Sequence, residues 1–537
     1  MVLQRFIEKV SVRFRKFKLI LPVLSGLFLG IGFLFPVLRI AGCFSLVPLF
    51  FFLDQETSWK RSFRAGFLAG FIFLGQVLIW YFYALPLDWL GIENRFLGFC
   101  LILSVWLLSV CALASFVGFF AAACRLFRKN AWVFLLAMPS LWIIFEYLRA
   151  WGFSFLFLGG ESLLGPHWTF GDLGYLWSFS PFLGKAAGLG GLYFLSFLLV
   201  FFNTVFYLLI KKLSTKGNPK EALKLVVLVV FSLFLSGYFI NFVENEKGGA
   251  DESLEVTVLN TDFSFNRGDQ LRDVAVEGLL EKIIGSSENP RIVVLPEGVN
   301  FLGSYQNRIL VEKLFASAPV LIIDSGKAWV DGELKNRIVF FDSQKGVLGY
   351  QEKIFLMPAG EYLPYLVLGP VEIFSPGWLD KFNLSRNFQK GEAIKPASFS
   401  DIGVGGLLCG EIISPGLYRG LSKGAEIIFN MGNHSSFGEK GILSRQIQSM
   451  AQLRAAENNR YLVRAANADF SYIIDNQGRL EEKSQVADGG LFTGKVALIS
   501  KESFYNRFGD WILIAALFFL LLTKLRIRSI IHLVQIK

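Results

Sequence analysis

A series of apolar runs, each long enough or nearly long enough to cross a lipid bilayer, limits the possible folds of this chain more than any other feature. A spanning helix needs about 20 apolar residues. Six runs have this character, at 19–38, 65–84, 96–124, 131–148, 186–210 and 225–242. Two shorter runs, at 41–53 and 511–523, bring the expected number of transmembrane helices to about eight. Because 53% of the 537 residues are hydrophobic, the sequence predicts a multi-span helical membrane bundle rather than a soluble protein.

Basic residues gather in every second loop between these runs. The basic loops contain Arg5, Lys9, Arg13, Arg15, Lys16 and Lys18; Lys60, Arg61 and Arg64; Arg125, Arg128 and Lys129; Lys211, Lys212, Lys216, Lys220 and Lys224; and Lys524, Arg526 and Arg528. The alternate loops hold little more than Arg39, Arg95, Arg149 and Lys185. This alternation follows the positive-inside rule, so we expect the basic loops in the cytoplasm. It also accounts for the net charge of +10 without a nucleic-acid partner.

The stretch from 248 to 506 has short β-branched runs between turns and polar helices, which predicts an α/β domain. The strand-like pieces are 254–260, 291–297, 320–324, 337–342, 402–409, 426–432, 460–467 and 470–475. We expect a bundle of seven transmembrane helices at 1–247, this domain at 248–506, and a C-terminal transmembrane helix with a basic cytoplasmic tail at 507–537. The α/β domain follows the seventh run, so it should lie outside the cytoplasm.

Cys409 is the only cysteine of the α/β stretch, and it is the last residue of the strand-like run 402–409. The other four cysteines lie in apolar runs, where a thiol behaves as a small hydrophobe; they are Cys43, Cys100, Cys111 and Cys124. Two more polar residues have similar positions: Glu297 is the last residue of the run 291–297, and Lys353 comes after a predicted hairpin. Open α/β sheets place their chemistry at such strand ends, so we expect these three side chains to form one site.

The three residue types can work together on a carbonyl group. A thiol with the ordinary pKa of about 8.5 is a weak nucleophile at neutral pH unless a base takes its proton. Glu297 can accept that proton, and the ammonium of Lys353 can stabilise the thiolate and then an oxyanion. The backbone N–H of Gly410 is a further candidate donor to the oxyanion. Singly, each side chain also fits a structural role: a buried thiol, a solvated hairpin charge or a turn residue.

Three segments resemble the Glu-Lys-Cys site of the nitrilase superfamily in their order and separation: LPE ending at Glu297, KIFLMPAGEYLP beginning at Lys353, and CGE beginning at Cys409. With the expected transmembrane helices, the chain resembles the apolipoprotein N-acyltransferase family of the bacterial inner membrane. Segments 188–203 and 454–467 are also similar to segments of that family.

The resemblance implies a nitrilase-like α-β-β-α sandwich on the helical bundle. It further implies Glu297 as the general base, Lys353 as the oxyanion stabiliser and Cys409 as the nucleophile, with Glu361 and Glu411 as supporting acids. Gly410 stands where the family usually has a tyrosine.

The implied function is transfer of a fatty acyl chain from a phospholipid, through a thioester on Cys409, to the N-terminal amine of a diacylglyceryl-cysteine apolipoprotein. The implied location is the bacterial inner membrane, with the α/β domain on the periplasmic side, and we expect a monomer. The sequence has no metal-ligand cluster and no nucleotide-binding glycine-rich loop, so no cofactor is implied. Two alternatives stay open. One is a weak or inactive lipid-binding scaffold, which only Gly410 favours, and the other is a membrane-anchored nitrilase-type amidase with a soluble substrate.

Two aromatic segments outside this site carry expectations of their own. Segment 362–382 is too apolar for a loop that faces only water, and we expect it at the membrane surface, where it would gate a path for lipid. Segment 152–177 is rich in Trp and Phe and is expected to form an interfacial aromatic belt, with a wall for lipid entry as the alternative. For His434 we expect a packing role.

Overall fold

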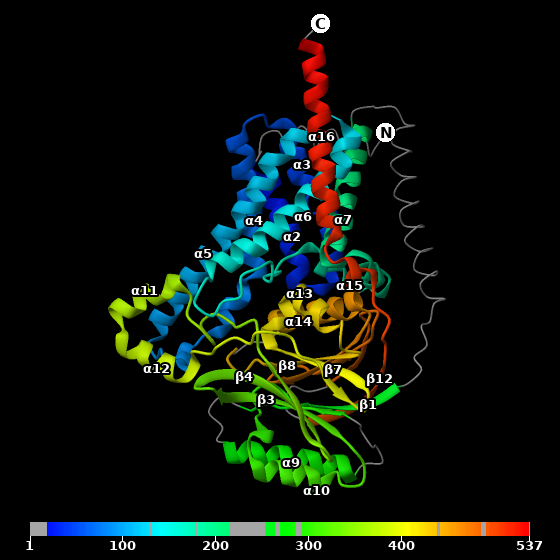
Figure 1. Ribbon diagram of the computed structural model, residues 1–537. Helices are drawn as coiled ribbons and strands as arrows, with labels where there is room; N and C mark the ends of the chain where they lie inside the picture. Colours follow the sequence, from blue (N-terminus) through cyan, green and yellow to red (C-terminus); the bar gives the residue numbers. More distant parts are fainter. Residues whose placement is uncertain are drawn as a thin grey trace.

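The computed structural model describes residues 19–128, 130–178, 180–214, 253–263, 269–285, 292–437, 441–484 and 490–535. Figure 1 shows a helical bundle in the upper half and an α/β sandwich in the lower half. The two parts of the predicted architecture are therefore both present. The apolar run at 225–242 and the boundary near 247 lie outside the described residues.

The bundle is built from seven α-helices among the described residues. They are α2 (Ile20–Leu34), α3 (Val47–Gln55), α4 (Trp59–Val77), α5 (Arg95–Ala123), α6 (Ala131–Leu156), α7 (Pro181–Ser214) and α16 (Trp511–Gln535). Short 3₁₀ segments join or extend them: η1 (Pro36–Phe44), η2 (Ile79–Ala84), η3 (Leu87–Leu90), η4 (Cys124–Phe127) and η5 (Leu173–Trp177).

Five stretches of the described residues are long and apolar enough to cross a membrane. They are Pro36–Gln55, Trp59–Ala84, Arg95–Phe127, Ala131–Leu156 and Gly184–Ser214. Two shorter apolar helices, Ile20–Leu34 and Trp511–Leu525, correspond to the first and last predicted runs. The multi-span bundle is confirmed, and the number of eight transmembrane helices stays a prediction.

Small residues let the helices of the bundle approach closely. A side chain at Gly26 of α2 would lie 2.5 Å from the carbonyl oxygen of Ala69 on α4. A side chain at Gly66 of α4 would likewise meet the carbonyl oxygen of Val117 on α5 at 2.5 Å. Close backbone contact of this kind is what holds helices together in lipid, where no hydrophobic driving force acts between them.

Helix α7 is kinked at Gly190 and Gly191, where the backbone leaves the helical region. Gly191 has a φ of +67°, and a side chain there would clash with the ring of Tyr505 in α15 (Phe504–Phe508). The first part of α7 lies against the sandwich, since Gly184 packs on the backbone of Gln477. The kink therefore joins a segment that supports the sandwich to one that continues through the bundle.

The described residues of the sandwich form two six-stranded sheets. The first has the order β12-β1-β2-β3-β4-β5, and the second has the order β11-β10-β9-β8-β7-β6. Pairs β1–β2, β2–β3, β7–β8 and β8–β9 are parallel, and the remaining pairs are antiparallel. The strands are β1 (Ser253–Asn260), β2 (Ile292–Val294), β3 (Leu321–Val330), β4 (Glu333–Asp342), β5 (Gly346–Glu352), β6 (Ala397–Phe399), β7 (Ile402–Leu408), β8 (Ile427–Asn433), β9 (Tyr461–Asn467), β10 (Tyr472–Ile474), β11 (Leu480–Lys483) and β12 (Gly490–Ala497).

Helices cover both outer faces of the sandwich, which gives the predicted α-β-β-α layering (Figure 1). Helices α9 (Asp269–Gly285) and α10 (Tyr305–Leu314) pack on the first sheet through an apolar cluster that includes Val276, Val311 and Ile322. Helices α13 (Pro415–Leu421) and α14 (Gly441–Asn458) cover the second sheet and lie between it and the bundle. Helices α11 (Tyr365–Phe374) and α12 (Pro376–Arg386) project sideways beside the bundle.

Helix α14 is buried on nearly all sides although its sequence is polar. Its Gln446 donates to the carbonyl oxygen of Val77 in the bundle at 3.0 Å. Its Arg454, fully buried, donates to the Tyr175 hydroxyl at 3.2 Å and forms an ion pair with Glu457 at 3.2 Å. Buried polar groups need such partners, so α14 works as a polar joint between sandwich and bundle.

Candidate active site

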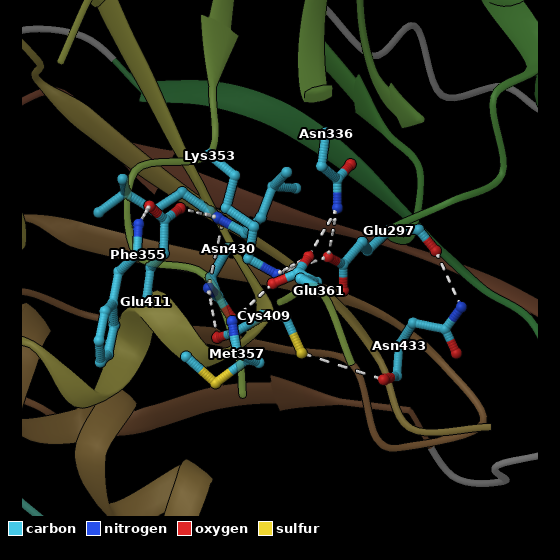
Figure 2. A network of polar contacts seen from close by, with 12 residues as sticks. Glu297, Asn336, Lys353, Phe355, Met357, Glu361, Cys409, Glu411, Asn430 and Asn433 are labelled. Atoms are coloured by element: carbon cyan, nitrogen blue, oxygen red, sulfur yellow. Dashed lines mark hydrogen bonds and ion pairs between the residues drawn. The ribbon is translucent and has the colours of Figure 1, made fainter. Parts of the chain in front are cut away.

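The structure brings the three predicted residues together from the two sheets. Glu297 follows β2, Lys353 directly follows β5, and Cys409 directly follows β7. Figure 2 shows their side chains converging, with Glu361, in one polar network. Because the three groups are neighbours, the charges of Glu297 and Lys353 both act on the pKa of the Cys409 thiol.

Lys353 lies at the centre of the network and is only 2% exposed. Its Nζ donates to Oε1 of Glu297 at 3.1 Å and to Oε1 of Glu361 at 2.8 Å. Asn336 of β4 donates to the same two oxygens, at 3.1 Å and 3.3 Å. The ammonium of Lys353 and the amide of Asn336 therefore hold both carboxylates in place. Each buried charge has a partner of opposite sign, as buried charges require.

These contacts set the protonation state of Lys353. Burial by itself would lower the pKa of the lysine, but the carboxylates of Glu297 and Glu361 outweigh burial and raise the pKa well above its ordinary value. Lys353 is therefore a permanent cation at physiological pH. It can stabilise negative charge but cannot serve as a base.

Glu361, predicted as a supporting acid, orients the loop after Lys353. Its Oε1 accepts from Lys353, and its Oε2 accepts from the backbone N–H of Met357 at 2.8 Å. Both carboxylate oxygens of Glu361 thus accept from groups of the same short loop. These hydrogen bonds hold the ammonium of Lys353 beside Glu297.

Cys409 has an unusual backbone conformation, with a φ of +40° in the left-handed region. Non-glycine residues adopt this region rarely, and such strain is common where a reactive side chain must be presented. The Sγ atom points to the carbonyl oxygen of Asn433 at 3.9 Å (Figure 2).

The thiol of Cys409 is protonated at rest. Burial and the nearby Glu297 carboxylate raise the pKa of the thiol to about 12, although Lys353 and Arg464 act in the opposite direction. Burial and the Glu297 carboxylate together outweigh the two cations, so the raised pKa favours the neutral thiol over a preformed thiolate. A base must accept its proton during any attack, and Glu297 is the neighbouring carboxylate.

Arg464 is a second buried cation of the site, which the sequence reasoning missed. It lies on β9, is fully buried, and contacts Oδ1 of Asn430. Asn430 in turn donates to the carbonyl oxygens of Leu407 at 3.2 Å and Cys409 at 3.5 Å. A charged residue inside the strand-like run 460–467 was the available signal for it. Asn336 carried no such signal.

Glu411, the second predicted supporting acid, ties the cysteine loop to the lysine loop. Its Oε2 accepts from the backbone N–H of Leu408 at 2.6 Å, and its Oε1 accepts from Ile354 at 2.9 Å and Phe355 at 3.1 Å. Burial raises the pKa of this carboxyl to about 7, against the effect of these donors. All of these hydrogen bonds come from backbone N–H groups, so Glu411 holds the two loops in position.

Gly410 leaves room for Met357. A side chain at position 410 would overlap the thioether of Met357, whose sulfur lies directly against the glycine. The space that a larger residue would take after the cysteine is therefore already filled from the lysine loop. The predicted donation by the Gly410 N–H to an oxyanion stays a prediction.

The bundle contacts two loops of the site. In segment 157–177, Thr169 donates to the carbonyl oxygen of Ile413 at 2.6 Å and His167 contacts the Ser414 hydroxyl at 2.8 Å. Tyr362 donates to the carbonyl oxygen of Phe157 at 2.8 Å. These contacts attach the loops after Cys409 and Lys353 to the bundle.

The aromatic segment 152–177 does not form the expected interfacial belt at its tryptophans. Trp168 and Trp177 are buried, and Trp168 packs edge to face on Phe355 with ring centroids 5.1 Å apart. The segment is enclosed because the sandwich lies directly on it. His434 is buried beside Asp469 at 2.9 Å, in keeping with its expected packing role.

Two family profiles match the chain in separate parts. The profile described as apolipoprotein N-acyltransferase N-terminal domain matches residues 25–205, and the carbon-nitrogen hydrolase profile matches residues 291–496. An apolipoprotein N-acyltransferase of Geobacter metallireducens is 28% identical over 96% of this chain and 96% of its own length. One of Rickettsia prowazekii is 23% identical over 94% of this chain and 96% of its own length.

Among solved structures, a carbon-nitrogen hydrolase of Helicobacter pylori is similar to part of the chain. It is 16% identical with a TM-score of 0.38, and the match covers 49% of this chain and 95% of that protein.

Proposed function

The chain belongs to the apolipoprotein N-acyltransferase family, and from this premise we propose that it transfers a fatty acyl chain from a phospholipid to the N-terminal amine of a diacylglyceryl-cysteine apolipoprotein. The observation that carries the proposal is the cluster of buried Glu297, buried Lys353 and half-buried Cys409 at the junction of sandwich and bundle. A lipid ester and a lipidated amine both have tails in the membrane, beside this junction.

In the first half-reaction the thiol of Cys409 attacks the ester carbonyl of the phospholipid while Glu297 accepts the thiol proton. The oxyanion that forms is stabilised by the ammonium of Lys353. When the tetrahedral intermediate collapses, the lysophospholipid oxygen leaves and takes the proton from Glu297. The acyl chain stays on Cys409 as a thioester.

In the second half-reaction the α-amino group of the apolipoprotein attacks the thioester. Glu297 accepts a proton from the amine, and the new oxyanion again faces Lys353. Collapse breaks the carbon–sulfur bond, and the cysteine sulfur recovers its proton from Glu297. The product is an amide, and the enzyme returns to its starting state.

The raised pKa of Cys409 favours this use of a general base over a resting thiolate. Glu361 and Glu411 act as positioning residues in the proposal. Glu361 directs Lys353 toward Glu297, and Glu411 joins the loops of Cys409 and Lys353.

We also propose the finer arrangement predicted from the sequence: a bundle at 1–247, a catalytic domain at 248–506 and a C-terminal helix with its tail at 507–537. The protein is a membrane protein, and in the proposal it lies in the bacterial inner membrane with the catalytic domain in the periplasm. The alternate basic loops support this orientation.

The two alternatives are less well supported. An inactive scaffold was suggested only by Gly410, and Met357 fills the space beside that glycine while the charged cluster is complete. An amidase with a soluble substrate would not need bundle segment 157–177 packed on the loops of its site.

The test is intact-protein mass spectrometry of the purified chain mixed with phosphatidylethanolamine or phosphatidylglycerol and no acceptor. We expect a fatty-acyl increment on Cys409 that hydroxylamine removes, and discharge of that increment by a diacylglyceryl-cysteine peptide with formation of an N-acyl peptide. No increment with any bilayer phospholipid would favour the scaffold. Rapid release of free fatty acid without transfer would favour a hydrolase.

A further inference from the structure

A cavity of about 230 Å³ lies within the bundle, far from the candidate active site. The ends of α3, η4, α6 and α7 enclose it, and its lining residues are Phe50, Leu53, Asp54, Cys124, Arg125, Arg128, Ala131, Phe134, Tyr207, Leu208, Lys211 and Lys212. We call it the basic cavity. It is far larger than the roughly 10–15 Å³ that one water molecule requires.

The basic cavity opens at the end of the bundle away from the sandwich. Figure 1 shows α3 near the upper end of the bundle, with the sandwich at the opposite end. Helix α7 touches the sandwich at Gly184 and runs from its kink at Gly191 to Lys211, about 30 Å at about 1.5 Å per residue. That distance is about the thickness of the hydrocarbon layer. The cavity therefore lies at the depth of the head groups in the leaflet opposite the sandwich.

Positive charge predominates in the lining. Arg125, Arg128, Lys211 and Lys212 contribute four cations, and Asp54 is the one carboxylate. Asp54 pairs with Lys211 at 2.6 Å. Arg128 donates to a neutral acceptor, the backbone carbonyl oxygen of Glu56, at 2.8 Å. Apart from the Lys211–Asp54 pair, the lining holds the guanidinium groups of Arg125 and Arg128, and none of its other residues is a carboxylate.

Arg125 shows where an anion would bind. Its Nε atom is buried and has no hydrogen-bond partner among the described residues. A buried donor without an acceptor costs free energy that an anionic oxygen would recover. The guanidinium fork is well suited to a phosphate group.

The remaining wall of the basic cavity is apolar. Phe50, Phe134 and Leu208 are buried there, immediately beside the cations. A free phosphate ion would gain nothing from this wall, whereas the glycerol and first methylene groups of a lipid would pack against it. The combination of apolar wall and cationic rim fits an amphiphile with an anionic head.

We propose that the basic cavity binds the phosphate head group of one anionic phospholipid from the leaflet opposite the sandwich. Basic pockets between transmembrane helices bind anionic head groups by the same chemistry. The site is separate from Cys409, so the proposal does not rest on the proposed function. A bound lipid would join α3, α6 and α7 at this end of the bundle.

The test is native mass spectrometry of the purified full chain, titrated with phosphatidylglycerol or with phosphatidylcholine of the same acyl chains. We expect the first phosphatidylglycerol to bind about tenfold more tightly than the first phosphatidylcholine. The double variant Arg125→Gln, Arg128→Gln should reduce this preference to twofold or less. Its charge-conserving counterpart Arg125→Lys, Arg128→Lys should keep most of the preference.

The matched control is Lys60→Gln, Arg64→Gln, which removes two exposed cations of α4 outside the cavity lining and should leave the preference unchanged. If Arg125→Gln, Arg128→Gln fails to fold, the single variant Arg125→Gln carries the test with an expected loss of about threefold.

Three outcomes would overturn the proposal. They are equal affinity of the wild type for the two lipids, the same loss of preference in the α4 control, and displacement of phosphatidylglycerol by millimolar inorganic phosphate. The last result would identify a site for free phosphate instead of lipid.

Discussion

At the residue scale, Glu297 and Lys353 have different roles in the proposed reaction. Their side chains contact each other, and the proposal assigns proton acceptance to Glu297, because the two carboxylate partners of Lys353 raise the pKa of the lysine and keep it a cation. Glu297→Gln keeps the size and shape of the side chain but removes the carboxylate that would act as the base. We expect it to lower acyl transfer by about 10²–10⁴-fold, as loss of a general base does. The measurement is single-turnover thioester formation followed by mass spectrometry.

Lys353→Met should lower the same rate by about 10²–10³-fold, through loss of the oxyanion contact, and Cys409→Ala should abolish it. The double variant of Glu297 and Lys353 should be little worse than either single one, because the groups act as a unit. Near-normal turnover of Glu297→Gln would contradict its assignment as the base even if the enzyme class stood. Glu361→Gln serves as the control for Glu297→Gln, since it weakens a contact to the Lys353 ammonium but keeps the carboxylate of Glu297.

At the element scale, helices α11 and α12 form most of segment 362–382, which was predicted to lie at the membrane surface, and they project beside the bundle. Trp378 donates to the carbonyl oxygen of Leu90 at 2.8 Å and Arg386 donates to that of Trp89 at 2.6 Å, so α12 is anchored on the bundle. Ile373 and Leu384 remain exposed on the two helices. An apolar surface beside the bundle is suited to lipid contact. We expect Ile373→Ser, Leu384→Ser to slow use of bilayer phospholipid severalfold and to spare a short water-soluble ester.

The control for these helices is Trp378→Phe, which removes the hydrogen bond to Leu90 and keeps an aromatic ring. If lipid contact by Ile373 and Leu384 matters, this variant should affect both substrates alike, through the position of α12. Equal losses on lipid and soluble ester in Ile373→Ser, Leu384→Ser would instead indicate that the helices only pack on the sandwich.

At the scale of the whole molecule, the orientation of the bundle decides which compartment the sandwich faces. The alternate basic loops predict the periplasm. In a variant without the four cysteines of the apolar runs, a cysteine at exposed Lys345 of the sandwich should react with an impermeant maleimide in cells whose outer membrane alone is opened. A cysteine at exposed Arg64 of α4 should react only after the inner membrane is opened as well. The reverse pattern would invert the proposed topology.

Buried polar contacts also hold the sandwich and the bundle together. Buried polar contacts of α14 with Val77 and Tyr175, and of segment 157–177 with Ile413 and Tyr362, cross between them. Breaking one such contact leaves a buried group without a partner, which costs about 1–3 kcal/mol. The polar joint should therefore resist separation of the two parts.

Local pattern alone determined much of the architecture. The apolar runs predicted the helices of the bundle, and short runs of β-branched residues predicted most central strands. Both patterns arise because apolar residues recur along a buried helix or strand at the period of that element. Strand ends carried Glu297, Lys353 and Cys409, so the trio could be found in the sequence. Strand β12 was missed, since its residues are mostly half-buried and show little alternation. Strand β11 was missed because it is mostly exposed.

Only the tertiary structure decided which distant groups meet. Asn336 bridges Glu297 and Glu361, and Arg464 reaches Asn430 beside the cysteine, across separations that no local period records. The burial of polar α14 and of Trp168 likewise depends on the bundle lying against the sandwich. The period of apolar residues predicts whether a side chain is buried. It does not predict which residue that side chain contacts, because the contact depends on how the sheets and helices pack in the folded chain.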